Sequence, residues 1–455
     1  MKPSRYTSIS LLLLDMIAVF MAFNISGLLR GVVQLDSLVT FPLLGPLVLM
    51  LLGFYLIDGY KARTDMLSLD YASQHLITLL VAMLCTLLIT FVLIPSGYTL
   101  QQSRSVVASS FLLLMPITLF YRRAIYNARM RVWQQRSLVF VGDAASCLLF
   151  AEECQKMNFT QPVIYTIPPG TTTPPFHAQT LMDFDQVLED IEKGTLAVEA
   201  LVLRESSREF SSEISQKLMR LYFSGVPTYG LELFHQVYWR KIPIYRLNQA
   251  WLFQDGFQIA REPVFERAKR ASDLILAALG LILATPLILL AGVAIWLEDR
   301  GPVFFTQSRI GRNRITFPIV KLRTMRVHQD SAARYTQEGD RRITRVGRFL
   351  RASRIDEFPQ LWNVLRGDMS LIGPRAEWER LVVDYERDIP CYHFRHLVKP
   401  GITGWAQVNY PYGASLEDTI RKLEYDLYYI RHFSFLLDAA IVLKTLHIML
   451  FGKGR

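Results

Sequence analysis

Apolar and polar stretches alternate over the first quarter of the chain, and the apolar stretches are long. A membrane-spanning helix needs about 20 mainly apolar residues, and four runs approach that length. They are Ser10–Leu28, Phe41–Leu56, Leu76–Ile94 and Val106–Phe120, the last of which is short. This pattern predicts a transmembrane region of four helices within residues 1–133.

Basic residues flank these four runs unevenly. Two of the connecting loops carry only Arg30 and Arg104, whereas both ends of the region and its second loop are more basic. The residues concerned are Lys2, Arg5, Lys61, Arg63, Arg122, Arg123, Arg129 and Arg131. Because basic residues stay on the cytoplasmic side of a membrane, both ends of the region are predicted to face the cytoplasm. Asp15 interrupts the first run, and either a function or access to the membrane interface would explain it.

Composition supports a membrane protein and excludes several other classes. Hydrophobic residues make up 51% of the chain and charged residues 20%, which excludes a disordered chain or a coiled coil. The four cysteines have no paired spacing, as expected for reduced thiols. The net charge of +10 favours anionic lipids or phosphorylated substrates as partners. No nucleic-acid-binding motif was found, so no nucleic acid partner is expected.

Residues 134–260 have the composition of a soluble domain. Short β-branched runs at Ser137–Val141, Pro162–Ile167 and Ala200–Leu203 alternate with amphipathic stretches, which predicts a Rossmann-like α/β module. The turn after the first run reads GDAAS and lacks two of the three glycines of a dinucleotide-binding G-x-G-x-x-G motif. We therefore expect a scaffold or regulatory module, with nucleotide binding as the alternative.

A fifth apolar run, Leu274–Leu297, differs from the first four. As a straight helix it would reach about 36 Å, enough to span a membrane. However, basic residues flank both of its ends, which places both ends in the cytoplasm. At its centre, Pro286 frees the Ile282 carbonyl and kinks the helix, while the Thr285 hydroxyl can bond a freed group. A re-entrant helix satisfies both features, and a proline-kinked crossing is the alternative.

The last third of the chain holds dense basic clusters around one acidic pair. Arginine and lysine at this density suit a diphosphate, a phosphorylated lipid or the membrane surface. Ser353, followed three residues later by Asp356, has the form of a helix N-cap, so Asp356 is expected in a first helical turn, where the dipole keeps it ionised. Adjacent Glu357 would project in another direction. The pair suits one carboxylate that attacks phosphorus and one that binds Mg²⁺.

Four segments of this region carry a family resemblance. They are KRASDLILAALGLILATPLILL, GPVFFTQSRIGRNRITFPIVKLRTM, VGRFLRASRIDEFPQLWNVLRGDMSLIGPRAE and LVKPGITGWAQVNYPYGAS. In order and content they resemble the monotopic phosphoglycosyl transferases, the bacterial sugar transferase family, and the whole chain is similar to its long, exopolysaccharide-type members. The resemblance implies a four-helix transmembrane region (1–133), a Rossmann-like cytoplasmic module (134–260) and an α/β-associated monotopic catalytic domain (261–455) with a re-entrant helix (274–297).

The resemblance also implies a chemistry and a set of site residues. In this family an Asp attacks the β-phosphate of a UDP-sugar, releases UMP and passes the sugar phosphate to undecaprenyl phosphate. Here the nucleophile would be Asp356, and Asp356 and Glu357 would be the ligands of Mg²⁺. Thr285 and Pro286 stand where the family's helix breaks at Ser-Pro. Phosphate or nucleotide contacts are expected from Arg309, Lys321, Arg323, Arg351, Pro374 and Arg375, although Ala376 replaces the second proline of the family's Pro-Arg-Pro block.

Location, partners and the choice of sugar follow from the same resemblance. We expect a multi-pass protein of the bacterial inner membrane whose active site faces the cytoplasm and which contacts membrane lipids. Its substrates would be a UDP-hexose and undecaprenyl phosphate, with glucose as the first expectation for the hexose and galactose as the second. The N-terminal helices offer a surface for a homodimer. The alternative is a non-enzymatic membrane regulator of polysaccharide assembly, which would need its soluble domain outside the cell.

Overall fold

Two compact units make up the chain. One consists of Arg123–Leu247, and the other combines Met1–Arg122 with Asn248–Arg455. The computed structural model describes residues 3–32, 43–61, 64–93, 104–133, 136–157, 159, 161–167, 181–204, 212–244, 263–326, 342–410, 413 and 415–451.

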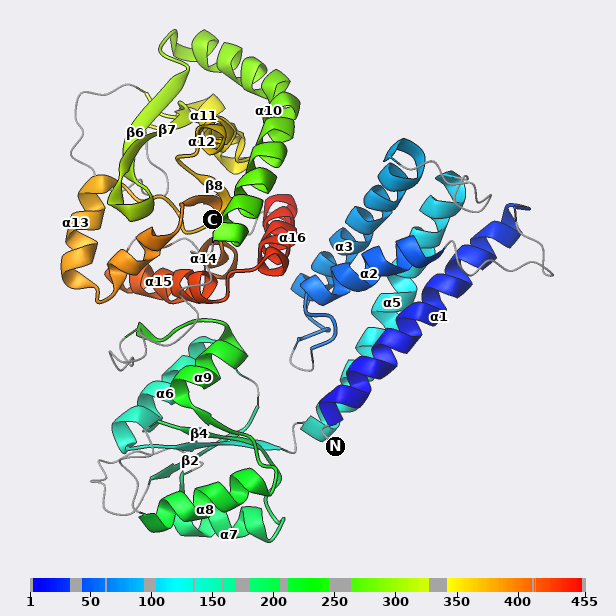
Figure 1. The fold of residues 1–455 in the computed structure, drawn as a ribbon, viewed down its shortest axis with the longest axis vertical. Coiled ribbons are helices and arrows are strands. Elements are labelled where there is room, and N and C mark those ends of the chain that lie inside the picture. Colours follow the sequence, from blue (N-terminus) through cyan, green and yellow to red (C-terminus); the bar gives the residue numbers. More distant parts are fainter. Residues whose placement is uncertain are drawn as a thin grey trace. The chain divides into compact units, whose positions relative to one another are not determined.

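Helices form the N-terminal part of the larger unit (Figure 1). Every predicted apolar run lies in one of them, but their lengths differ from the prediction. α2 has 13 residues, about 20 Å, and is too short for a straight crossing. The run expected to be short, Val106–Phe120, lies within the long helix α5. The bounds are α1 Pro3–Leu29, α2 Leu44–Leu56, α3 Leu69–Leu88 with a π-helical end at Ile89–Leu93, and α5 Arg104–Trp133.

Length and composition therefore allow three of these four helices to cross a membrane. The qualifying stretches are Ser8–Leu29, Leu69–Phe91 and Arg104–Ala128. α2 ends early because Asp58, with a φ of 60°, begins a turn that a helix cannot continue through. The prediction of four straight crossings in this region is corrected to three long helices and one short apolar helix.

A buried ion pair joins three segments of this helical region. Arg122 Nη2 on α5 donates to Asp15 Oδ2 on α1 at 2.5 Å, and neither side chain is exposed. The hydroxyl groups of Tyr60 and Tyr121 also donate to this carboxylate. Arg122 Nη1 donates to the Gly59 carbonyl at 2.6 Å. Asp15 therefore ties α1 and α5 to the turn after α2, and its carboxylate is satisfied without access to the membrane interface.

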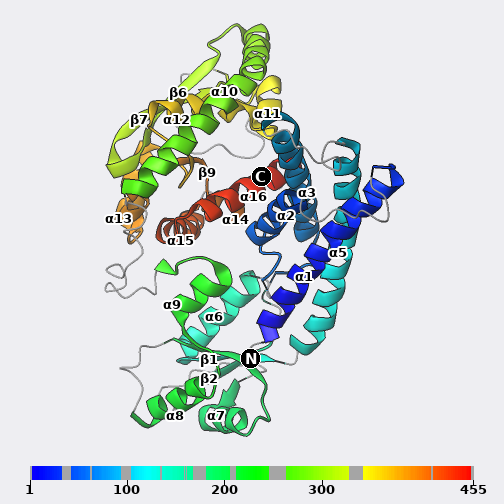
Figure 2. The ribbon, with the colours of Figure 1, turned by 45° about the vertical axis from the view of Figure 1, so that its right-hand side comes forward.

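A parallel five-stranded sheet forms the core of the smaller unit, in the order β3-β2-β1-β4-β5. The three strands expected from the sequence are confirmed, and two short strands, β3 and β5, were not expected. Helices α6 and α9 cover one face of the sheet, and α7 and α8 cover the other (Figures 1 and 2). The strands are β1 Ser137–Val141, β2 Val163–Ile167, β3 Leu181–Asp183, β4 Val198–Leu203 and β5 Thr228–Gly230, and the helices are α6 Ala144–Lys156, α7 Phe184–Glu192, α8 Ser212–Phe223 and α9 Leu231–Phe234.

Alternation along β1 explains the two helical layers. Leu138 and Phe140 pack with α6 and α9, whereas Val139 and Val141 pack with α7 and α8, as the two-residue period of a strand requires. Immediately after β1, Asp143 accepts a hydrogen bond from Ser146 N at 3.2 Å and so caps α6. A carboxylate thus occupies the helix N-terminus at which a dinucleotide fold would bind a pyrophosphate.

The fifth apolar run lies in a single long helix, α10 (Pro263–Asp299), which also has the length and composition of a membrane span. The helix bends along its length (Figure 1). The Thr285 hydroxyl donates to the Leu281 carbonyl at 2.7 Å, next to Pro286. A proline beside a threonine that bonds back into the helix is a known cause of bending.

Both halves of α10 pack on the same C-terminal domain. In the first half, Ala277 lies in a cluster with Val364, and Leu361 packs against this cluster. In the second half, Ala291 and Ile295 lie in a cluster with Leu322 and Leu350. Large apolar side chains on the remaining surface of the helix are exposed, among them Ile275, Ile282, Leu283, Leu289, Leu290 and Leu297.

Short helices and strands complete the C-terminal domain around α10 (Figure 1). β6 and β7 form an antiparallel hairpin, and β8 pairs with β9 in parallel. The strands are β6 Phe304–Ile310, β7 Thr316–Leu322, β8 Ser370–Ile372 and β9 Gly401–Thr403. The helices are α11 Arg345–Ala352, α12 Gln360–Arg366, α13 Glu379–Asp388, α14 Trp405–Asn409, α15 Leu416–Arg431 and α16 Phe435–Phe451, with 3-10 turns η8 at Ile355–Glu357 and η9 at Tyr392–Leu397.

The Asp15–Arg122 pair is expected to be essential for the stability of the helical region. Asp15→Leu leaves a buried guanidinium without a counter-charge, which should cost about 3–5 kcal/mol. Thermal unfolding in detergent, followed by circular dichroism, should therefore show a clear fall in Tm. The double variant Asp15→Leu/Arg122→Met should unfold at a higher temperature than the single variant, because it buries no charge. An Asp15→Leu protein as stable as the wild type would contradict this account.

Candidate active site

The acidic pair lies in a tight turn between α11 and α12. Ser353 follows α11 and donates its hydroxyl to the Phe349 carbonyl at 2.9 Å. Arg354 comes next, with a positive φ of 59°, and the 3-10 turn Ile355–Glu357 follows directly. The prediction that Ser353 caps a helix holding Asp356 is therefore wrong, because Ser353 ends the preceding helix. The residue spacing was that of a cap, but a cap also requires backbone angles that spacing does not determine.

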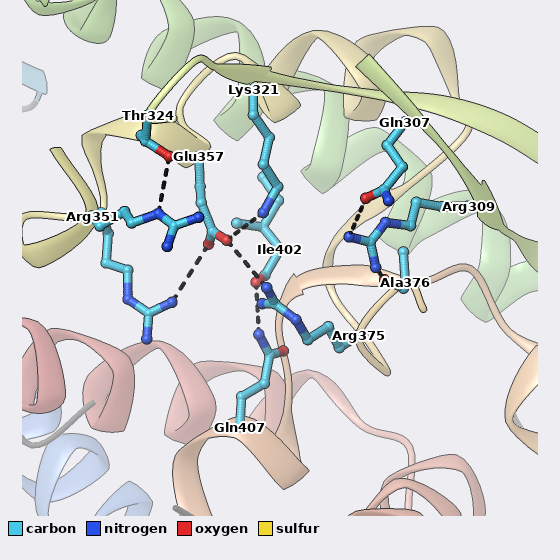
Figure 3. Close-up of polar contacts among 11 residues, drawn as sticks. Gln307, Arg309, Lys321, Thr324, Arg351, Glu357, Arg375, Ala376, Ile402 and Gln407 are labelled. Atoms are coloured by element: carbon cyan, nitrogen blue, oxygen red, sulfur yellow. Dashed lines mark hydrogen bonds and ion pairs between the residues drawn. The ribbon is translucent and has the colours of Figure 1, made fainter. Parts of the chain in front are cut away.

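Three basic side chains converge on Glu357 (Figure 3). Lys321 Nζ, on β7, lies 2.8 Å from Glu357 Oε1, and Arg375 Nη2, in the loop after β8, lies 3.4 Å from the same oxygen. Arg354 Nη1 lies 4.0 Å from Oε2. Burial alone would raise the pKa of Glu357, but Lys321 and Arg375 outweigh it and hold that pKa well below its usual range. Glu357 is therefore ionised at every physiological pH.

Asp356 has a different electrostatic environment from its neighbour. It is 8% exposed, and its Oδ1 has no hydrogen-bond partner among the residues that the structure describes. Burial, and then the negative charge of Glu357, raise the pKa of Asp356 to about 6, against the opposing charges of Lys321 and Arg351. The expected lowering of this pKa by a helix dipole does not occur. Above about pH 6, Asp356 is a poorly solvated carboxylate with one unbonded oxygen, which favours nucleophilic attack.

Two of the arginines expected to bind phosphate have different surroundings. Arg351, near the end of α11, donates from Nε to Thr324 Oγ1 at 2.9 Å, and its positive charge acts on Asp356. Arg323 instead pairs with Asp299, with 2.8 Å between Nη1 and Oδ2. This buried guanidinium fastens the chain after β7 to the end of α10, and none of its described contacts is with the acidic pair.

Arg309 and Pro374 support the backbone around Arg375. Arg309 Nη1 donates to the Ala376 carbonyl at 3.1 Å, and its Nη2 donates to Gln307. Figure 3 shows this group apart from the cations around Glu357. The Pro374 carbonyl accepts a hydrogen bond from Gly401 N at 2.9 Å. The described contacts of both residues are with the backbone beside Arg375 and not with the acidic pair.

Three polar residues near the acidic pair were not expected from the sequence. Arg354 approaches Glu357 because its left-handed backbone turns the chain. Gln360, one helical turn beyond Asp356, is buried, and its Nε2 has no hydrogen-bond partner in the described part of the chain. Gln407 projects towards Arg375 in Figure 3 and donates to the Ile402 carbonyl at 3.1 Å. Backbone angles and long-range contacts bring these residues to the site, and neither is visible in residue spacing.

The acidic pair offers only part of a metal site. Within the described ranges, no cluster of three or more His, Cys, Asp or Glu side chains has the spacing of metal ligands. Mg²⁺ is usually held by one or two carboxylates together with the phosphates of a substrate. The unpartnered Asp356 Oδ1 fits such a role, whereas Glu357 Oε1 already contacts two cations. The residues present therefore fit a Mg²⁺ ion that is bound jointly with a phosphorylated ligand.

The whole arrangement suits chemistry at a phosphate. A carboxylate with an unbonded oxygen can attack phosphorus, and Lys321, Arg351, Arg354 and Arg375 can neutralise phosphate oxygens as charge develops. Covalent transfer through Asp356 is therefore chemically possible without any further nucleophile.

Known proteins share this region of the chain. Residues 264–452 match the family described as bacterial sugar transferase. A UDP-N-acetylgalactosamine-undecaprenyl-phosphate N-acetylgalactosaminephosphotransferase of Aeromonas hydrophila is 37% identical over 298 residues, which are 65% of this chain and 69% of that protein. A UDP-glucose:undecaprenyl-phosphate glucose-1-phosphate transferase of Xanthomonas campestris pv. campestris is 42% identical over 208 residues, 45% of this chain and 42% of that protein. A protein of the same name from Caulobacter vibrioides is 45% identical over 185 residues, 40% of this chain and 69% of that protein.

The Asp356 carboxyl is expected to titrate at about pH 6. Infrared difference spectra between the wild type and Asp356→Asn should show the band of a protonated carboxyl that disappears as the pH rises through this value. Glu357→Gln removes a negative neighbour, so the pKa of Asp356 should fall and the band should disappear at a lower pH. A wild-type band that titrates at the ordinary pKa of aspartate would contradict the analysis.

Proposed function

This chain belongs to the bacterial sugar transferase family, and we propose that it transfers hexose-1-phosphate from a UDP-sugar to undecaprenyl phosphate. The observation that supports this reaction is the buried Asp356 carboxylate, whose Oδ1 is unbonded, beside the cations gathered by Glu357. The printed names of the relatives describe transfers of the same class. The reaction would serve as the first membrane step of exopolysaccharide or related glycan synthesis.

In the first step, an oxygen of Asp356 attacks the β-phosphorus of the UDP-sugar. A bond forms between that oxygen and phosphorus, the bond from phosphorus to the bridging oxygen breaks, and UMP leaves with the bridging oxygen. Negative charge grows on UMP and on the phosphoryl oxygens, and Lys321, Arg351 and Arg375 neutralise it. The product is an aspartyl-phosphosugar on Asp356.

In the second step, a phosphate oxygen of undecaprenyl phosphate attacks the same phosphorus and releases the Asp356 carboxylate. Splitting the transfer allows UMP to leave before the lipid phosphate enters, so two bulky anions need not share one site. The exposed apolar surface of α10 suits lipid chains, with Leu283 77% and Leu290 68% exposed. The Asp299–Arg323 pair links the end of this helix to the chain just after Lys321.

Mg²⁺ is proposed as the cofactor. Asp356 and Glu357 would hold it together with oxygens of the diphosphate. When bound, the ion would screen the diphosphate charge that otherwise repels the Asp356 carboxylate. The protein side chains then orient the substrate and stabilise the leaving UMP, as described above.

A membrane arrangement accompanies this chemistry. We propose a multi-pass protein of the inner membrane with a cytoplasmic active site, in which α10 is re-entrant and the sheet of the smaller unit is a Rossmann-like module. The bend at Pro286 and the packing of both halves of α10 on one domain support re-entry. The parallel strand order with helices on both faces supports the Rossmann-like assignment.

The sugar is the least constrained part of the proposal. Glucose remains the first choice because two of the relatives carry it in their names, and galactose remains the second. The relative aligned over 298 residues is named for N-acetylgalactosamine, so UDP-N-acetylgalactosamine belongs in any substrate panel. Product analysis with these three UDP-sugars and undecaprenyl phosphate identifies the hexose.

Covalent labelling tests the proposed function. Enzyme incubated with a UDP-sugar labelled in the sugar, without undecaprenyl phosphate, should acquire protein-bound label at Asp356. Asp356→Asn should acquire none and should lose turnover, while its thermal unfolding stays close to that of the wild type because the amide has almost the same shape. Absence of labelled lipid from a folded wild-type enzyme, with every UDP-sugar in the panel, would refute the function itself.

Cysteine labelling tests the re-entrant helix. In a background with the four native cysteines changed to serine, single cysteines at Ala271→Cys and Arg300→Cys flank the apolar part of α10. Both should react with an impermeant reagent only from the cytoplasmic side. Pro286→Leu should favour a straight crossing, because it removes the kink. Labelling of the two wild-type-helix positions from opposite sides would show that α10 spans the membrane.

A further inference from the structure

The loop that carries Arg375 is held by its backbone on one side. It leaves β8 at Ile372, and Gly373 N donates to the Thr403 carbonyl at 2.9 Å. Gly401 N donates to the Pro374 carbonyl, also at 2.9 Å. These bonds tie the loop to β9, but they leave the carbonyls of Ile372 and Arg375 to other partners.

A buried guanidinium binds the Arg375 carbonyl from the opposite side. Arg395, in η9, donates from Nη2 to this carbonyl at 3.0 Å and to Asp426 Oδ2 at 2.8 Å. Its Nη1 donates to the Tyr392 hydroxyl at 2.6 Å. Arg395, Tyr392 and Asp426 are all buried. A planar guanidinium with several donors can serve three acceptors at once, which a lysine cannot reproduce with the same geometry.

Helix α15 supplies two contacts to this loop from the same face. Asp426 orients Arg395, and Tyr429, three residues later, places its hydroxyl 3.2 Å from the Ile372 carbonyl. Residues three apart are neighbours on a helix surface. The same hydroxyl lies 2.8 Å from Asp438 Oδ1 on α16. One helix thus reaches both ends of the short segment 372–375, directly at Ile372 and through Arg395 at Arg375.

We propose that Asp426, Arg395 and Tyr429 are positioning residues that hold the segment 372–375, and with it the Arg375 side chain, in place beside Glu357. The inference rests on the proposed function, in which Arg375 contacts the nucleotide or diphosphate of the UDP-sugar. Burying a charged pair is unfavourable unless its geometry is used, and here the pair ends on a backbone carbonyl of the site. The consequence is specific: these residues govern capture of the UDP-sugar and the first step, and not the transfer to lipid.

Asp426→Asn and Tyr429→Phe test this role. In both variants, the KM for the UDP-sugar in UMP release should rise about tenfold, the effect of weakening one buried hydrogen bond to a charged group. Transfer from a preformed labelled enzyme to undecaprenyl phosphate should stay within about twofold of the wild type. Glu424→Gln is the matched control, because Glu424 is a buried carboxylate of the same helix that pairs with Arg421 of that helix at 3.3 Å. This variant should leave the KM unchanged.

Hydrogen–deuterium exchange gives a readout that does not depend on turnover. Amides in residues 371–376 should exchange faster in Asp426→Asn and Tyr429→Phe than in the wild type and Glu424→Gln. Unchanged exchange in this segment, or an equal loss in both half-reactions, would overturn the positioning role. If the wild type releases no UMP from any UDP-sugar, the proposed function fails, whereas the exchange data still decide whether α15 orders the segment. Tyr429→Phe keeps the test valid if Asp426→Asn does not fold.

Discussion

The charged site depends on one buried carboxylate, Glu357. Lys321 from β7, Arg354 from the preceding turn and Arg375 from the loop after β8 all contact it. Charges interact strongly where water is excluded, so this contact fixes the relative positions of segments that are distant in the sequence. The same negative charge contributes to the raised pKa of Asp356. One interaction therefore both assembles the cations for a diphosphate and adjusts the ionisation of the nucleophile.

The surrounding fold holds these cations from outside the site. Arg323 and Asp299 fasten the chain after β7 to α10, and Arg395 with Asp426 fastens the loop of Arg375 to α15. α10 in turn exposes most of its apolar side chains, as expected for a helix that contacts lipid. The contacts thus connect a lipid-facing helix to a phosphate-binding site through a few buried ion pairs. This connection is what a transferase with one soluble and one lipid substrate requires.

Local patterns predicted the parts of the structure that local patterns determine. The apolar runs, three strands of the parallel sheet and the bend at Pro286 follow from hydrophobicity, β-branching and proline chemistry. The cap assigned to Ser353 failed because Arg354 adopts a left-handed backbone that spacing cannot reveal. Family blocks indicated Asp356, Glu357, Lys321 and Arg375, which the structure brings together. Arg395 and Asp426 escaped notice because a contact between residues 31 positions apart is a property of the folded chain.

The central claim is that Asp356 reacts before the lipid phosphate arrives, and isotope exchange tests it most directly. The enzyme is incubated with unlabelled UDP-sugar and labelled UMP in the absence of undecaprenyl phosphate. If an aspartyl-phosphosugar forms, its reversal by labelled UMP must place label in the UDP-sugar. The account predicts this exchange in the wild type and none in Asp356→Asn. Exchange that occurs only when undecaprenyl phosphate is present would show that both substrates react in a single step, and it would contradict the account.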